Sequence, residues 1–535
     1  MGWGFGFKSR LNDSSIKPKF VLQFLGMPFF EGDAFTIYGG FSTTEDLSIS
    51  SRGPIVQGSS VIPSSWNVSF GGFTVPITGS PNKLFKTIRK GSIAQLFVIL
   101  GGEKERVAIG YLKNIRGFGN SWNLEFADLL SCSRADGRKG SSTLPTGNDP
   151  DHFDFFYLVG KEALVTTNWH KTGSNFPDKL YVSDIRIFKQ ETGIDGIAKC
   201  RDSSGNDFYL AYSSVVSSGS APAGYLQLTK VYSDTDVEYP SINSPTNLST
   251  NDIITSVAIL TDKPWTIFGK ILLSRTGTST NPFDKYPQSY NFGGYLATDL
   301  FDYGDANSQS YIKSSNSGTD YKWSMIITSP MKSLRDFVTK SSKSGQFPVW
   351  RQNSFSWRGS VNPNDIANIK HLITNRDIIR INSIDIFDPN QKSIFCRSVI
   401  NYGVTSSSAV LQKSLTKSAN QISSLPAESF IVRDNSYLYD FDPNTASTNR
   451  GHCADGDLSR LFVWDNNIWT KISMKVKLKY AQLCAGDIVE IESEYINIYS
   501  EAGQLNQRHR ALIIAVDFDF VDCSCNLELA ILAKD

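Results

Sequence analysis

The end of the chain alternates between apolar and polar side chains. Residues 474–480 follow this pattern without a break, with apolar residues on one face and three lysines on the other: Lys475, Lys477 and Lys479. A period of two is the side-chain period of a β-strand with one buried face. The segment is therefore predicted to be a half-buried strand.

Three further runs of this kind follow, at 486–492, 510–520 and 526–532. Gly486 and Asp487 open the first of them and are typical turn residues. Four strands joined by short turns, with no helix between them, are typical of a small antiparallel barrel or sandwich. We predict such a barrel over residues 425–535.

Part of this pattern occurs a second time near the amino terminus. Three stretches match in the same order: 90–97 with 486–489, 106–109 with 510–513, and 123–127 with 526–530. The last two pairs lie 404 and 403 positions apart, so the match is nearly in register. Alternation restricts the choice of residues, so unrelated strands also produce such matches by chance. We favour a duplicated barrel, with its first copy in residues 1–135.

The chain between these two regions divides into two parts. Residues 133–151 are rich in Gly, Ser, Asp and Pro and indicate an exposed loop or linker. Strand patterns at 207–212 and 225–228 follow it. They predict an inserted β-rich domain over residues 136–250.

Helix signals first appear clearly beyond that domain. Ser329-Pro330 and Asn362-Pro363 each place a capping residue before a proline at the first helical position. An isoleucine-rich strand pattern follows at 376–387. We therefore predict a central α+β domain over 251–424. The expected fold is mainly β with an α+β middle region: a multidomain chain in which two similar antiparallel β-barrels flank the central and inserted domains.

The overall composition gives no sign of a strongly charged partner at the whole-chain level. The 535 residues carry 53 basic and 52 acidic side chains, a net charge of +1. Nothing in this balance indicates a nucleic-acid or membrane-surface binder. The seven scattered cysteines form no CxxC pair and predict free thiols in a reducing compartment. No signal-peptide pattern is present, and no run approaches the ~20 apolar residues of a membrane span.

No residue spacing predicts catalysis, a metal site or a cofactor. The five histidines form no HExxH or HxH pattern, and no P-loop, GxSxG or GxGxxG motif occurs. His452 beside Cys453 is interpreted as part of a loop rather than a zinc site. A carboxylate pair for glycoside hydrolysis stays open, because the two groups need not be close in sequence. We expect a protein that is not an enzyme and carries no cofactor.

Three stretches, taken together and in order, resemble tail hub proteins of long-tailed bacteriophages and gene transfer agents. They are 271–277 with its continuation through 282–287 and 291–296, then 345–352, and then 486–489. The resemblance covers the carboxy-terminal half of the chain, and the first barrel by pattern only. Residues 136–250 match nothing in that family.

The resemblance implies a structural role in the virion, at the tail tip or baseplate. Such hubs are trimers with two similar barrels per chain, so that three chains form a pseudo-sixfold ring. The ring would join a sixfold tail tube or distal tail protein to a threefold spike, fibre or tape-measure protein. DNA would pass through the channel without specific binding during genome ejection. Assembly would take place in the cytoplasm of the bacterial host.

Contacts between neighbouring barrels are expected from the two matched regions. The candidate interface residues are Lys475, Lys477, Lys479, Asp487, Arg106 and Arg510. The lysine row has a second interpretation, because lysines often protect an edge strand from aggregation.

A different function also stays open. The many Trp and Tyr residues and the β-rich composition are compatible with a receptor-binding or glycan-degrading tail protein. The sequence lacks the repeat period of 20–50 residues that is typical of solenoid spikes, so we favour the hub.

Overall fold

The computed structural model describes about half of the chain, mostly in strands. The described segments, apart from a few isolated residues, are 3–13, 15–24, 29–33, 48–52, 68–69, 93–118, 121–127, 159–188, 196–201, 207–219, 222–233, 246–262, 323–327, 346–352, 354–359, 369–385, 397–402, 411–416, 430–435, 461–465, 469–496, 498–499, 505–506, 508–520 and 522–532. The helices expected from Pro330 and Pro363 lie outside these segments.

The first sheet is built near the amino terminus and has the order β2-β1-β5-β6-β7. Its strands are β1 (Lys19–Phe24), β2 (Phe29–Asp33), β5 (Ile93–Leu100), β6 (Glu103–Phe118) and β7 (Ser121–Ala127). All neighbours are antiparallel. Gly101 and Gly102 form the turn from β5 to β6 with φ of +57° and +91°, a backbone that favours glycine. Helix α1 (Phe5–Arg10) precedes this sheet.

The second sheet has the order β19-β25-β28-β29-β24-β20, and β28 also pairs with β3, which pairs with β4. Its strands are β3 (Ser48–Arg52), β4 (Val68–Ser69), β19 (Ile369–Thr374), β20 (Ile378–Asp385), β24 (Trp469–Lys477), β25 (Ile488–Glu492), β28 (Arg508–Asp519) and β29 (Ser524–Leu532). β19 and β20 are consecutive in the chain but stand at opposite ends of this order. The sheet therefore curls back on itself.

The strand predicted at 474–480 extends further than the strand in the structure. β24 ends at Lys477, and residues 478–482 form a short 3₁₀-helix, η5 (Leu478–Gln482). Leu478 and Tyr480 remain buried in it, while Lys479 stays partly exposed. The alternation in the sequence thus reports burial correctly at these positions, although the backbone is no longer extended.

The inserted region forms a separate antiparallel barrel. Its strands are β8 (Glu162–Leu164), β10 (Lys179–Val182), β11 (Gly196–Arg201), β12 (Asp207–Ser217), β13 (Gly224–Ser233) and β15 (Ile253–Asp262). They follow the order β10-β13-β12-β11-β15-β8. An isolated bridge between Val165 and Val182 then joins the β8 side to β10 and closes the barrel. Its core contains Trp169, Leu210 and Leu226, all at most 2 % exposed.

Smaller strand groups complete the described part of the chain. They are β9 (Trp169–Lys171) with β14 (Thr246–Leu248), β16 (Trp323–Ile327), β17 (Gln346–Arg351) with β18 (Ser354–Gly359), the set β21 (Arg397–Tyr402), β22 (Leu411–Thr416) and β23 (Phe430–Asn435), and β26 (Ile498–Tyr499) with β27 (Leu505–Asn506). β16 pairs with the far half of β15.

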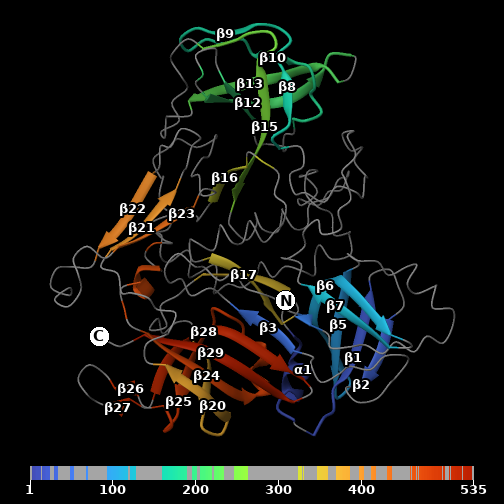
Figure 1. Ribbon diagram of the computed structural model, residues 1–535, viewed down its shortest axis with the longest axis vertical. Helices are drawn as coiled ribbons and strands as arrows, with labels where there is room; N and C mark the ends of the chain where they lie inside the picture. The colour runs from blue at the N-terminus through green and yellow to red at the C-terminus, as the bar shows by residue number, and fades with distance from the viewer. Residues whose placement is uncertain are drawn as a thin grey trace.

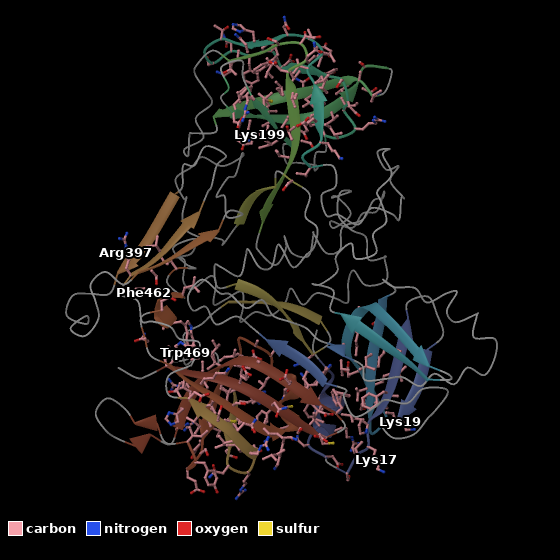
Figure 2. All side chains as sticks on the ribbon, in the orientation of Figure 1. Lys17, Lys19, Lys199, Arg397, Phe462 and Trp469 are labelled. Atoms are coloured by element: carbon pink, nitrogen blue, oxygen red, sulfur yellow. The ribbon has the colours of Figure 1, made fainter. Side chains whose placement is uncertain are left out.

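The arrangement places the two large sheets side by side at one end of the molecule and the inserted barrel at the other (Figure 1). Figure 2 marks the barrel by Lys199 of β11 and the second sheet by Trp469 of β24. The protein is multidomain and mainly β, so the predicted fold class is confirmed.

Candidate assembly interface

The two large sheets contain the same three-stranded meander. In the first sheet it is β5-β6-β7, and in the second it is β25-β28-β29. One residue of each central strand pairs with a residue on both neighbours, which defines equivalent rows: Ile93–Tyr111–Ala127 and Ile488–Leu512–Ala530. The outer strands of the two meanders thus align as the sequence match places them.

The central strands align differently from the sequence match. The match paired Arg106 with Arg510, but the ladder places Arg106 opposite Phe97. In the second sheet, the equivalent row joins Glu492 to Arg508. Arg106 therefore corresponds to Arg508. A bulge in β6 beside Leu96 and Phe97, without a counterpart between β25 and β28, contributes to this shift.

The amino-terminal segment contacts both sheets. Trp3 is 2 % exposed, and its indole Nε1–H donates to the carbonyl oxygen of Arg106 on β6 at 2.9 Å. The same ring packs edge-to-face on Phe7 and on Phe518 of β28, with centroid distances of 5.1 and 6.3 Å. Phe520 completes the cluster at 6.4 Å from Trp3. We call Trp3, Phe7, Phe518 and Phe520 the aromatic wedge.

Hydrogen bonds between backbone and side-chain groups hold the aromatic wedge in place. The N–H of Trp3 donates to Oε1 of Gln352 at 2.6 Å. The amide of Gln352 in turn donates to the carbonyl oxygen of Gln482, at the end of η5, at 3.2 Å. The N–H of Gly4 donates to Glu105 of β6 at 2.7 Å. Figure 1 shows α1 between the two sheets.

A strand from the first half of the chain also enters the second sheet. β3 pairs with residues Ala515–Asp519 of β28, while the other half of β28 pairs with β25 on Arg508–Leu512. The long central strand of the second meander is thus covered along its length by segments far apart in the sequence. Together with the aromatic wedge, β3 ties the two repeated sheets into one unit.

The corner where β19 turns into β20 is held by one carboxylate. Asp377 is 6 % exposed and accepts hydrogen bonds from the Tyr480 hydroxyl at 2.8 Å and from Thr374. Nζ of Lys479 lies 2.5 Å from its other oxygen. Burial acts to raise the pKa of Asp377, but the bonds from Lys479 and Tyr480 outweigh it and hold the pKa below its usual value. Burial and the adjacent carboxylate raise the pKa of Tyr480.

Exposed aliphatic side chains lie on the two strands that end this sheet. Ile379 and Ile384 of β20 are 55 % and 37 % exposed, and Leu372 of β19 is 40 % exposed. Within the described residues, β20 pairs on one side only, with β24. A strand with open backbone groups and exposed isoleucines is suited to pairing with another chain.

The predicted lysine row does not lie on a sheet edge. β24 is flanked by β29 and β20, so protection of an edge does not explain the row, and that interpretation is wrong. Nζ of Lys475 lies 3.3 Å from Asp522, and Lys479 contacts Asp377. Lys477 is exposed. The proposed contact of these lysines with a partner stays a prediction.

The other three candidates lie within the fold of the chain. Asp487 is 2 % exposed and accepts the N–H of Cys484 at 3.0 Å, which fixes the turn before β25. Arg106 is 9 % exposed and donates to Gln95 at 2.9 Å. Arg510 is half-buried beside Glu490, at 3.4 Å. The structure thus assigns internal contacts to these side chains.

Sequence reasoning missed Trp3, Gln352 and Asp377. Trp3 stands in the aromatic and glycine alternation that opens the chain, which was the one available signal. Gln352 and Asp377 act through partners more than 100 positions away. No local pattern points to such contacts.

No family model matches the sequence, and no curated protein matches it. Among solved structures, the 43 kDa tail protein of prophage MuSo2 from Shewanella oneidensis is similar over 96 % of this chain and 98 % of its own, at 10 % identity and a TM-score of 0.34. A chain of the native gene transfer agent virion is similar over 74 % and 90 %, at 11 % identity and a TM-score of 0.31. Prophage tail protein gp18 from Listeria monocytogenes EGD-e follows with 69 % and 96 % coverage, 9 % identity and a TM-score of 0.28.

Proposed function

We propose that this chain is a structural hub of a phage tail tip or baseplate. Three chains would form a ring of six barrel-like sheets, two from each chain. One side of the ring would meet a sixfold tail tube or distal tail protein. The other side would meet a threefold spike, fibre or tape-measure protein. This role requires neither catalysis nor a cofactor.

The observation that carries the proposal is the repeated meander. The same three-stranded antiparallel meander occurs in two sheets of one chain. A trimer that presents six similar surfaces would need two such units in each chain. A closed ring also requires a heterologous contact that repeats around the axis. Within one chain, the aromatic wedge and β3 supply the contact between first and second sheet. The contact between chains would then join the second sheet of one chain to the first sheet of the next.

The exposed edge of β20 is the surface that we assign to this contact between chains. It offers backbone groups for strand pairing and two exposed isoleucines. A near-neutral chain, with a net charge of +1, is compatible with a channel through which DNA passes without being held. No helix among the described residues is long and apolar enough to cross a membrane.

The test is the mass of the purified full-length chain in solution. We expect a trimer of 59.3 kDa chains by mass photometry, and a ring with six lobes by cryo-electron microscopy. A trimer without sixfold pseudosymmetry would contradict the ring. A monomer at all concentrations, including in the presence of a tail-tube ring, would contradict the hub itself.

A further inference from the structure

The inserted barrel carries an apolar and aromatic strip on its outer surface. Ile253 of β15 and Leu164 of β8 pair directly and are 49 % and 42 % exposed. On the neighbouring strand β10, Tyr181 is 37 % exposed. It pairs with Tyr225 of β13, and the two rings lie 5.5 Å apart. Apolar side chains gathered on the surface of a domain are typical of a binding surface.

The next row beside the tyrosines is polar. Lys179 pairs with Gln227, and its ammonium lies 5.1 Å from the centre of the Tyr225 ring. The Gln227 amide donates to the exposed carboxylate of Asp178 at 3.1 Å. This carboxylate and the lysine keep further hydrogen-bonding capacity toward solvent. Two tilted tyrosine rings thus stand beside an amide and a carboxylate, and the Lys179 ammonium lies over one face of the Tyr225 ring.

This combination matches a sugar better than a protein. A pyranose ring has an apolar face of C–H groups that packs on an aromatic ring, and hydroxyls around its rim that need donors and acceptors. Lys and Asp are depleted in the cores of protein–protein interfaces, yet here they adjoin the tyrosines. The strip is therefore suited to a ligand that carries both an apolar face and polar groups on one ring, as a sugar does.

Charge narrows the class of sugar. Residues 159–262 contain eight Lys and Arg but twelve Asp and Glu. An acidic domain repels nucleic acids and acidic polysaccharides. A neutral polysaccharide carries no charge that this domain would repel.

The position of the barrel fits a recognition role. The first half of β15, up to Val257, belongs to the barrel, and its second half pairs with β16. One continuous strand therefore leads from the barrel to the rest of the chain. Figure 1 shows the barrel at the end of the molecule opposite the two large sheets.

We propose that the outer face of β10 and β13 binds a neutral polysaccharide, with Tyr181 and Tyr225 as the stacking platform. Lys179, Gln227 and Asp178 bind the hydroxyls at its edge. The proposal does not depend on the hub, because every residue that carries it lies within the inserted barrel.

The experiment measures retention of the full-length chain on insoluble chitin, cellulose and starch, and on immobilised neutral and acidic oligosaccharides. We expect retention on at least one neutral polymer and at least a tenfold weaker affinity for the double variant Tyr181→Ala/Tyr225→Ala. The matched control is Tyr495→Ala, which removes a 64 % exposed tyrosine next to β25 and should leave the affinity unchanged.

Lys179→Ala is a second variant that keeps both rings, and it should weaken the same binding several-fold. Unchanged melting temperatures of these variants show that the barrel is intact. The proposal is overturned if no neutral polymer retains the chain. In that case, a protein would be the expected ligand of the strip. It is also overturned if acidic polymers alone retain the chain, or if the folded double variant binds as well as the unaltered chain.

Discussion

Single residues decide how the two sheets of this protein are joined, and Trp3 is the clearest case. It lies against β6 through a hydrogen bond, and it packs on Phe518 of β28 and on Phe520, just after the end of that strand. Replacement of a buried Trp by Ala removes its packing and leaves a cavity, at a cost of about 3–5 kcal/mol. We expect Trp3→Ala to lower the free energy of unfolding by this order, measured by chemical denaturation.

Two controls separate the parts of that effect. Trp3→Phe keeps most of the ring contacts but loses the indole donor, so it should cost less than Trp3→Ala. Phe5→Ala removes a neighbouring ring that is 88 % exposed and should change stability little. Equal stability of Trp3→Ala and the unaltered chain would show that the aromatic wedge does not hold the sheets.

Asp377 gives the corner of the second sheet a defined pH dependence. Its folded pKa lies below the unfolded value of ~3.9, so its contribution to stability is present above that value and is lost as the pH falls through the folded pKa. We expect Asp377→Asn to lose stability at pH 7 and to show a flatter stability curve in acid than the unaltered chain. Urea unfolding at a series of pH values measures both effects.

The control for this pH dependence is Asp522→Asn. Asp522 also contacts a lysine, Lys475, but its side chain is 62 % exposed. An exposed ion pair of this kind contributes little, so the variant should follow the curve of the unaltered chain. An identical acid slope in Asp377→Asn and the unaltered chain would refute the assignment.

At the scale of elements, the sequence predicts what is local and misses what is distant. The apolar runs at 510–520 and 526–532 identify β28 and β29 because most of their side chains are buried, on both faces over 511–516 and 529–532. They cannot show that β3 pairs with β28, because the partners are more than 450 positions apart and β3 is a serine-rich segment without alternation. The sequence also fails to predict β8, because three residues are too few to show a period.

The candidate site was predicted least well, and its residues show why. Arg106 and Asp487 were chosen for their places in matched stretches, yet both are buried and bonded inside the chain. Exposed Ile379 and Ile384, by contrast, look like core residues in the sequence, but they are exposed on β20, the strand at the end of the sheet.

The entry of β3 into the second sheet can be tested by proline substitution. Adjacent strand residues direct their N–H groups to opposite sides, so one of Ser50 and Ser51 donates toward β28. We expect one of the variants Ser50→Pro and Ser51→Pro to speed hydrogen exchange of the amides at 515–519 more than the other. Ser50→Ala and Ser51→Ala keep the donor and should leave exchange slow. Unchanged exchange in both proline variants would argue against the pairing.

At the scale of the whole molecule, the described structure has two parts. One is the pair of large sheets, which the aromatic wedge and β3 connect, and the other is the inserted barrel. The two sheets that share the meander are connected at one end, and a closed barrel lies at the other end on β15 (Figure 1). Changes at the two ends should therefore have independent consequences. A charge on the edge of β20 should affect assembly, whereas a charge on the barrel should affect only ligand binding.

The double variant Ile379→Glu/Ile384→Glu tests this separation. Both side chains are exposed in the single chain, so we expect its folding and melting temperature to change little. In a ring, however, two carboxylates would be buried against the next chain without a partner, which is strongly unfavourable. Mass photometry should therefore show monomers in place of trimers. Ile253→Glu, at an equally exposed site on the barrel, should leave the trimer intact. A trimer that tolerates both changes would place the contact between chains elsewhere than on β20, while leaving the repeated meander and the wedge that joins its two copies unaffected.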